Sequence, residues 1–142
     1  MPARASAEWH GAVRSGIGEF TAGDSITGGF TYKSRFEGGP GSNPEQLLGA
    51  AHASCFSMAL ASLLERAGTP AERIHTDAEV TIRPVDGTPT ITKIDLTTVG
   101  VAPDVDEAAF TEHALNAKAN CPVSRALAGV PEVNLAATLE SR

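Results

Sequence analysis

Residues 43–64 determine how this chain folds, and they read NPEQLLGAAHASCFSMALASLL. Asn43 is suited to cap a helix, Pro44 to occupy its first turn, and Gln46 follows the cap by three residues, as in a capping box. Gly68 is a typical residue just beyond a helix end. The sequence therefore predicts one helix from Asn43 to about residue 67, on the order of 35 Å long.

This helix is apolar or small on almost every side. From Gln46 to Leu64 it has no Asp, Glu, Lys or Arg, and the run is about long enough to span a bilayer. Serines and His52 interrupt it, many of its apolar residues are alanines, and it lacks basic or aromatic flanks. We therefore expect no membrane span, but a buried central helix covered by a sheet and by another subunit.

The segments around this helix alternate with the period of strands. Upstream, Ala7–Val13 is a candidate edge strand, and Gly28–Phe36 places Arg35 on the face opposite its aromatic residues. Downstream, the pattern predicts a hairpin of strands 74–83 and 90–101, a helix capped by Asp104 and Glu107 that ends near residue 120, a short helix 122–128 and a strand 133–139. The expected fold is α+β, with a largely antiparallel sheet wrapped around the long helix.

Composition limits the class of protein. The 142 residues fit one domain, residues 1–142, with 42% hydrophobic and 20% charged residues. The net charge of −6 argues against a nucleic-acid partner and against docking on an anionic membrane. The first residues show no apolar signal-peptide core, so we expect a cytoplasmic protein, in which cysteines are more often catalytic or metal-binding than structural.

The chain has two cysteines, and both are expected on inward-facing helical surfaces. Cys55 lies in the middle of the long helix, and Cys121 lies at a helix break before Pro122, where free backbone N–H groups can stabilise a thiolate. Both could instead be small buried hydrophobes. Zinc is another alternative, since His52, Cys55, His113 and Cys121 could form a ligand set, but the close cysteine pairs typical of structural zinc are missing.

Arg35 and Glu45 are the charges nearest the apolar helix in sequence. Glu45 precedes Cys55 by ten residues, so the two lie roughly 15 Å apart along a continuous helix. One subunit cannot bring them together, whereas two copies of the helix crossing about a two-fold axis could. An ordinary solvated ion pair remains the simpler interpretation of these two charges.

Three segments closely resemble the OsmC family of osmotically inducible hydroperoxide peroxidases, and the resemblance covers nearly the whole chain. They are Arg35–Gly38, Asn43–Leu60 and Ala119–Ser124. The chain is more similar to the OsmC subgroup than to the organic hydroperoxide resistance (Ohr) subgroup, because Arg35–Gly38 leads into Asn43-Pro44-Glu45 and because Val123 stands where Ohr proteins usually carry Tyr.

The resemblance implies an intertwined homodimer with two active sites at its interface. Cys55 would be the peroxidatic cysteine and Cys121 the resolving one, while Arg35 would stabilise the thiolate and Glu45 would hold Arg35. The implied function is reduction of organic hydroperoxides in oxidative or osmotic stress, with a thiol reductant such as a lipoylated protein. No flavin, haem or nicotinamide motif is present, so no cofactor is expected.

An apolar pocket formed by residues such as Phe56 and Met58 is expected to favour alkyl hydroperoxides. Two other functions stay open on the residues alone. The chain could be a small-molecule binding protein with inert cysteines, or a structural domain stabilised by zinc.

Overall fold

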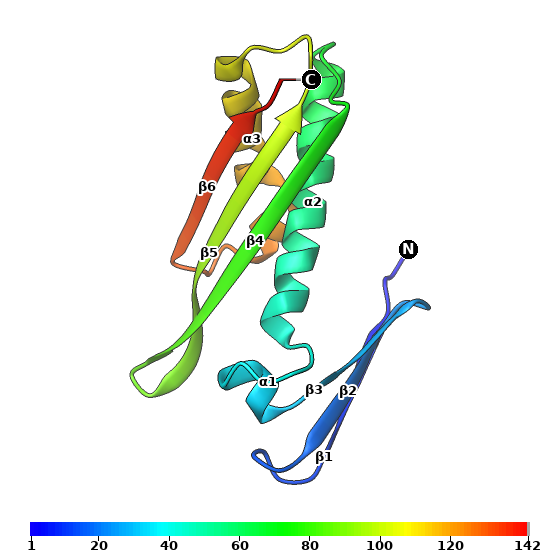
Figure 1. Ribbon diagram of the computed structural model, residues 1–142, viewed down its shortest axis with the longest axis vertical. Helices are drawn as coiled ribbons and strands as arrows, with labels where there is room; N and C mark the ends of the chain where they lie inside the picture. Colours follow the sequence, from blue (N-terminus) through cyan, green and yellow to red (C-terminus); the bar gives the residue numbers. More distant parts are fainter. Residues whose placement is uncertain (142) are drawn as a thin grey trace. The chain divides into compact units, whose positions relative to one another are not determined.

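The computed structural model describes residues 1–141, which form two compact units, Met1–Leu47 and the residues from Leu48 onward (Figure 1). The elements follow one another along the chain as β1 Ala5–His10, β2 Ile17–Ala22, β3 Ile26–Phe30, α1 Tyr32–Phe36, α2 Pro44–Arg66, β4 Arg73–Val85, β5 Thr88–Val101, α3 Glu107–Asn120, α4 Pro122–Ala126 and β6 Glu132–Leu139. The α+β class is confirmed, while the single domain over residues 1–142 stays a prediction.

The first unit contains an antiparallel sheet in the order β1-β2-β3. Its middle strand, β2, was not predicted, and β1 begins and ends a few residues before the expected strand. Phe20 of β2 lies directly opposite Gly28 of β3, and a side chain at Gly28 would meet the Phe20 ring. This pairing of a ring with a glycine across the strands supplies the packing that the glycine lacks.

The strand expected to continue to Phe36 ends at Phe30, so that prediction is wrong. Thr31 caps a short helix instead: its Oγ1 accepts a hydrogen bond from the Ser34 N–H at 3.0 Å, and the Ser34 Oγ accepts one from the Thr31 N–H at 2.9 Å. These reciprocal bonds satisfy free N–H groups at the start of α1 and outweigh the alternating pattern. Arg35 therefore lies on a helix, not on a strand.

Helix α2 begins and ends as its sequence predicts. The Asn43 Oδ1 accepts a hydrogen bond from the Gln46 N–H at 2.8 Å. At the other end Gly68 has φ +81°, and the Thr69 N–H donates to the Leu64 carbonyl at 2.9 Å, which closes the last turn. The helix is long and apolar enough to cross a membrane by length and composition, and only 28% of that window is buried within this chain.

The second unit contains the sheet β4-β5-β6. The expected hairpin is present, with β4 and β5 antiparallel and a tight turn at Asp86-Gly87, where both residues have positive φ. Strand β6 pairs with β5 in parallel. The described residues thus form two three-stranded sheets with one parallel pair, and the expectation of one sheet wrapped around the helix needs that correction.

The core of the second unit lies between this sheet and helices α2 and α3, which pack on the same face of it (Figure 1). Helix α3 is capped by Asp106, whose Oδ1 accepts from the Ala109 N–H at 2.8 Å, and not by Asp104 as expected. Helix α3 buries Phe110, Ala114 and Ala117. The core residues are Phe56, Leu60, Leu64, Ile94, Leu96, Ala102, Phe110, Ala114, Ala117 and Cys121.

Candidate active site

Cys121 occupies the junction between α3 and α4. It is both the last cap of α3 and the N-cap of α4, because Pro122 has no N–H to continue the first helix. Its Sγ accepts a hydrogen bond from the Ser124 N–H at 3.3 Å and lies 3.0 Å from the Ser124 Oγ. The residue is 1% exposed, so its sulfur is held in place by α4 and shielded from water.

Cys55 lies beside this junction, on α2, and both cysteines are free thiols. The Val123 N–H, from the first turn of α4, donates to the Cys55 Sγ at 3.5 Å. Burial raises the pKa of the Cys55 thiol, the Val123 N–H lowers it, and the neighbouring Cys121 thiol raises it through a hydrogen bond and its charge. The net shift of the Cys55 pKa is upward, which favours the neutral thiol in the isolated chain.

His52 lies one helical turn before Cys55 and is fully buried, at 0% exposed. Its Nε2 is 2.7 Å from the Ser124 Oγ, whereas its Nδ1 is buried without a hydrogen-bond partner among the described residues. Burial lowers the pKa of His52, which favours the neutral imidazole. The sequence alone suggested His52 only as a possible zinc ligand and did not single out the Ser124 hydroxyl. The position of Ser124, three residues after the cysteine that caps α4, was the sequence signal that could have pointed to this hydroxyl.

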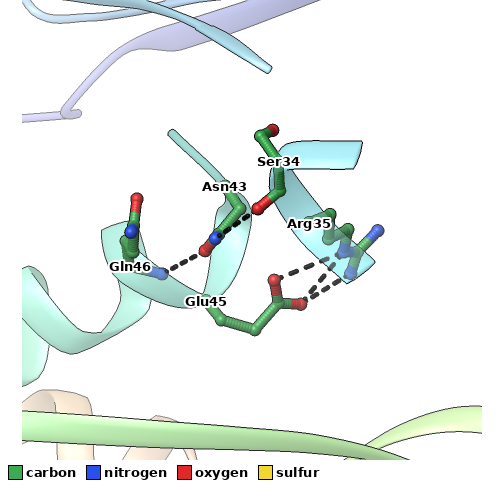
Figure 2. Close-up of polar contacts among 5 residues, drawn as sticks. All are labelled: Ser34, Arg35, Asn43, Glu45 and Gln46. Carbon is green, nitrogen blue, oxygen red and sulfur yellow. Dashed lines mark hydrogen bonds and ion pairs between the residues drawn. The ribbon is translucent and has the colours of Figure 1, made fainter. Parts of the chain in front are cut away.

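Arg35 and Glu45 form a second constellation, within the first unit (Figure 2). The Arg35 Nε donates to Glu45 Oε1 at 3.1 Å and Oε2 at 3.3 Å, and its Nη2 donates to Oε1 at 2.8 Å. The Glu45 side chain is 7% exposed and that of Arg35 36%. Such a two-nitrogen grip on a buried carboxylate fixes the plane of the guanidinium.

The loop between α1 and α2 fixes the positions of Arg35 and Glu45 relative to each other. The Asn43 Nδ2 donates to the Ser34 carbonyl at 3.1 Å, while the Asn43 Oδ1 caps α2 (Figure 2). One asparagine thus joins the turn that carries Arg35 to the turn that carries Glu45. The guanidinium keeps one nitrogen, Nη1, outside the ion pair and remains partly exposed, so it can still bind an anion.

The four predicted site residues therefore form two pairs. Cys55 and Cys121 accept from neighbouring N–H groups of α4, and Arg35 forms an ion pair with Glu45, each pair inside one unit. Helix α2 carries a member of both pairs, with Glu45 in its first turn and Cys55 ten residues later, roughly 15 Å along a continuous helix.

The zinc alternative gains no support, because residues 1–141 contain no group of three or more His, Cys, Asp or Glu side chains placed to hold a metal ion. The expected substrate pocket also needs correction. Phe56 is fully buried in the core, and Met58 is 79% exposed on the outer face of α2. The hollow that reaches Cys121 has a volume of about 330 Å³ and is lined instead by Ala59, Ser62, Leu63, Arg66, Asn116, Ala117, Asn120, Cys121 and Pro122.

Two free thiols, Cys55 and Cys121, lie beside one helix junction of this α+β scaffold. The chain belongs to the OsmC family, since the model for OsmC-like proteins matches residues 37–136. It is 40% identical over 126 residues to "Peroxiredoxin OsmC" of Escherichia coli K12, covering 87% of this chain and 88% of that protein. It is 29% identical over 138 residues to the uncharacterized protein YmaD of Bacillus subtilis, covering 94% and 91%.

Solved structures share the fold. The OsmC-like protein of Mycoplasma pneumoniae matches with a TM-score of 0.72 at 19% identity, over 98% of this chain and 97% of that one. The organic hydroperoxide resistance protein OhrB of Bacillus subtilis matches with a TM-score of 0.68 at 24% identity, over 96% and 98%. The arrangement of helices and strands is therefore that of the OsmC and Ohr proteins.

Proposed function

We propose that this chain is a thiol-dependent peroxidase that reduces organic hydroperoxides, with Cys55 as the attacking thiolate and Cys121 as its resolving partner. The observation that carries the proposal is that two successive N–H groups of α4 serve the two sulfurs, Val123 donating to Cys55 Sγ at 3.5 Å and Ser124 to Cys121 Sγ at 3.3 Å. The 40% identity to a protein named Peroxiredoxin OsmC supports the reaction type, and the Ohr names among the structural matches suggest the substrate class.

The first step is attack of the Cys55 thiolate on the terminal oxygen of the hydroperoxide. The O–O bond breaks, an S–O bond forms, and the alkoxide takes a proton to leave as an alcohol. Cys55 becomes a sulfenic acid and carries the oxidising equivalent.

The second step joins the sulfurs. Cys121 attacks the Cys55 sulfur, the S–O bond breaks, and a disulfide forms as water leaves. An external thiol reductant then returns both cysteines to thiols, and a lipoylated protein is the candidate reductant. Both sulfurs already lie at the first turn of α4, on the N–H groups of Val123 and Ser124, which favours this step.

Ionisation of Cys55 requires a cation, because burial and the Cys121 thiol raise the pKa of Cys55. Arg35 has the chemistry for this role, with Glu45 orienting its guanidinium. Since α2 separates Glu45 from the Cys55 of its own chain by roughly 15 Å, we place Arg35 of the partner subunit at each Cys55. The active chain is then a homodimer.

The outer face of α2 fits such a pairing. Met58 is 79% exposed, and Ala50, Ser54 and Ala61 form an exposed row of small residues beside it. An apolar or small helix face of this kind is typical of a surface that a second helix covers. We propose a cytoplasmic location, where a thiol reductant is available.

Steady-state turnover tests the proposed function. The wild-type chain should consume cumene hydroperoxide with dihydrolipoamide as reductant, and the expected product is cumyl alcohol. Cys55→Ser should abolish consumption. Cys121→Ser should complete one turnover and then stall, with Cys55 trapped as sulfenic or sulfinic acid. The control is Ser57→Ala, which changes a half-buried serine on the same helix as Cys55 and should keep wild-type rates. Steady turnover by both cysteine variants would count against the mechanism, and a wild-type chain without turnover would point to a binding protein with inert cysteines.

A further inference from the structure

A line of three side chains leads from Cys121 into the protein interior, and the mechanism above does not use its far end. The Cys121 Sγ is 3.0 Å from the Ser124 Oγ, which is 2.7 Å from the His52 Nε2. Both distances are within hydrogen-bond range, and a hydroxyl can donate and accept at once. All three residues belong to the second unit.

We propose that His52 acts through Ser124 to accept the Cys121 proton when Cys121 attacks the oxidised Cys55. This inference rests on the proposed function and deepens it, because it assigns a route for the proton that resolution must release. His52 is a positioning residue in this scheme, since it touches neither the hydroperoxide nor a reacting sulfur.

The proton balance is as follows. The Cys121 thiol gives its proton to the Ser124 hydroxyl, which passes its own proton to the His52 Nε2 as the S–S bond forms. The S–O bond of the sulfenic acid breaks, and the departing hydroxide takes up a proton from solvent to become water, and the proton that His52 later releases to solvent replaces it. His52 then returns to its neutral form by losing its proton, so the net products are one disulfide and one water.

The geometry suits the state before and the state after transfer. Before transfer, the thiol donates to the Ser124 Oγ and the hydroxyl donates to a bare Nε2. After transfer, the two hydrogen bonds point the other way, and the Ser124 hydroxyl donates to the Cys121 sulfur. The Ser124 N–H donates to the same sulfur at 3.3 Å throughout, so one serine supplies both groups that stabilise a Cys121 thiolate.

A histidine that only fills space would not explain these contacts. The Nδ1 is buried with no partner in residues 1–141, and an unpaired buried polar group costs stability. An apolar side chain would fill the site without this cost. Burial lowers the pKa of His52 and keeps the imidazole neutral, which is the form that can accept a proton. The tautomer with the hydrogen on Nδ1 leaves Nε2 free for the Ser124 hydroxyl.

Rapid mixing separates the two chemical steps and provides the test. Reduced protein is mixed with one equivalent of cumene hydroperoxide, the attack is followed by loss of hydroperoxide, and resolution is followed by the lifetime of the Cys55 sulfenic acid, trapped with dimedone and measured by mass. The variants are His52→Gln, Ser124→Ala and the double variant. Ser124→Ala keeps the backbone N–H to Cys121 and removes only the partly buried hydroxyl, so it should fold.

Both single variants should attack hydroperoxide within about twofold of the wild-type rate and resolve at least about tenfold more slowly, in line with the usual effect of a proton acceptor. The double variant should resolve no more slowly than either single variant, because each single substitution already removes the whole proton route from Cys121 to His52. Raising the pH should restore resolution in His52→Gln, since solvent then takes the Cys121 proton. The control is Ser57→Ala, whose native hydroxyl donates to the Thr76 Oγ1 at 2.8 Å, away from this line. It should change neither step.

Wild-type resolution rates in His52→Gln and Ser124→Ala, with attack proceeding normally, would overturn the inference and leave the peroxidase function intact. Multiplying losses in the double variant, or slow resolution that higher pH does not restore, would also overturn it in favour of a packing role. A wild-type chain that never forms the sulfenic acid overturns the proposed function and this inference together.

Discussion

At the scale of single residues, the central problem is the ionisation of Cys55. Burial raises the pKa of its thiol, and the neighbouring Cys121 raises it further. The contribution that lowers the pKa is one backbone N–H, from Val123, at a long distance of 3.5 Å. The proposed peroxidase mechanism needs a thiolate, so it needs a positive charge from elsewhere, and we propose Arg35, held by Glu45, as its source.

Replacing Arg35 tests that requirement. Arg35→Ala should raise the pKa of Cys55, because a close opposite charge that favours the thiolate is lost, and should slow attack on hydroperoxide. Glu45→Ala should have a weaker effect, because Glu45 orients the guanidinium. The thiolate absorbance and the single-turnover rate report the two quantities. Arg14→Ala removes the same charge from the first unit, where Arg14 stacks on Tyr32 at 4.5 Å, and should leave both unchanged. An unaltered Cys55 pKa in Arg35→Ala would remove Arg35 from the site.

At the scale of elements, the sequence predicted those with strong local signals. The cap at Asn43 and the glycine at residue 68 set the limits of α2, and the period-two pattern predicted the β4–β5 hairpin. It missed β2 because glycines and polar residues dilute the alternation around Phe20. It placed Arg35 on a strand because the reciprocal Thr31–Ser34 cap depends on two small side chains within an alternating pattern.

The candidate site was predictable to a similar extent. The four residues Arg35, Glu45, Cys55 and Cys121 were named from the family motif, and the structure forms the two pairs. The Ser124 and His52 contacts were not predicted, because they join residues 72 positions apart and depend on how α4 packs against α2. Helical spacing alone could not reveal that contact.

The packing of α3 against β5 yields a stability prediction. A Cβ added at Gly100 would lie 2.5 Å from the Phe110 ring, and that ring is fully buried in the core. Gly100→Ala should therefore lower the free energy of unfolding by about 1–3 kcal/mol, the usual cost of overpacking. Chemical denaturation measures it. Gly129→Ala is the matched control, since nothing lies within 4 Å of the added atom, and it should change stability little. Equal stability of the two variants would contradict this prediction, because it would mean that the Phe110 ring can move aside for the added methyl group without cost.

At the scale of the whole molecule, the account requires two chains. The long helix is only 28% buried by its own chain over its most apolar window, and Met58 lies on its exposed face. We expect sedimentation to show a stable homodimer at micromolar concentration. Met58→Asp should weaken the dimer, because it places a charge in an apolar interface. A folded, active monomer of the wild-type chain would contradict the shared site.

A mixed dimer tests which chain supplies the cation. One subunit carries Cys55→Ser, and the other carries Arg35→Ala with Glu45→Ala. If Arg35 of the partner subunit serves each Cys55, one of the two sites keeps every group, and roughly half of the wild-type activity should survive. The homodimers of either parent are the controls and should be inactive or much slower. A mixed dimer as inactive as its parents would assign Arg35 and Glu45 to the cysteine of their own chain.

The most direct test of the central claim is a thiol count after one equivalent of organic hydroperoxide. Reduced wild-type protein is mixed with cumene hydroperoxide without a reductant, and free thiols and peptide masses are measured. Two thiols should disappear per hydroperoxide consumed, and one Cys55–Cys121 disulfide should appear in the same chain. Loss of hydroperoxide with both thiols intact, or a Cys55 that gains oxygen while Cys121 stays reduced, would contradict it.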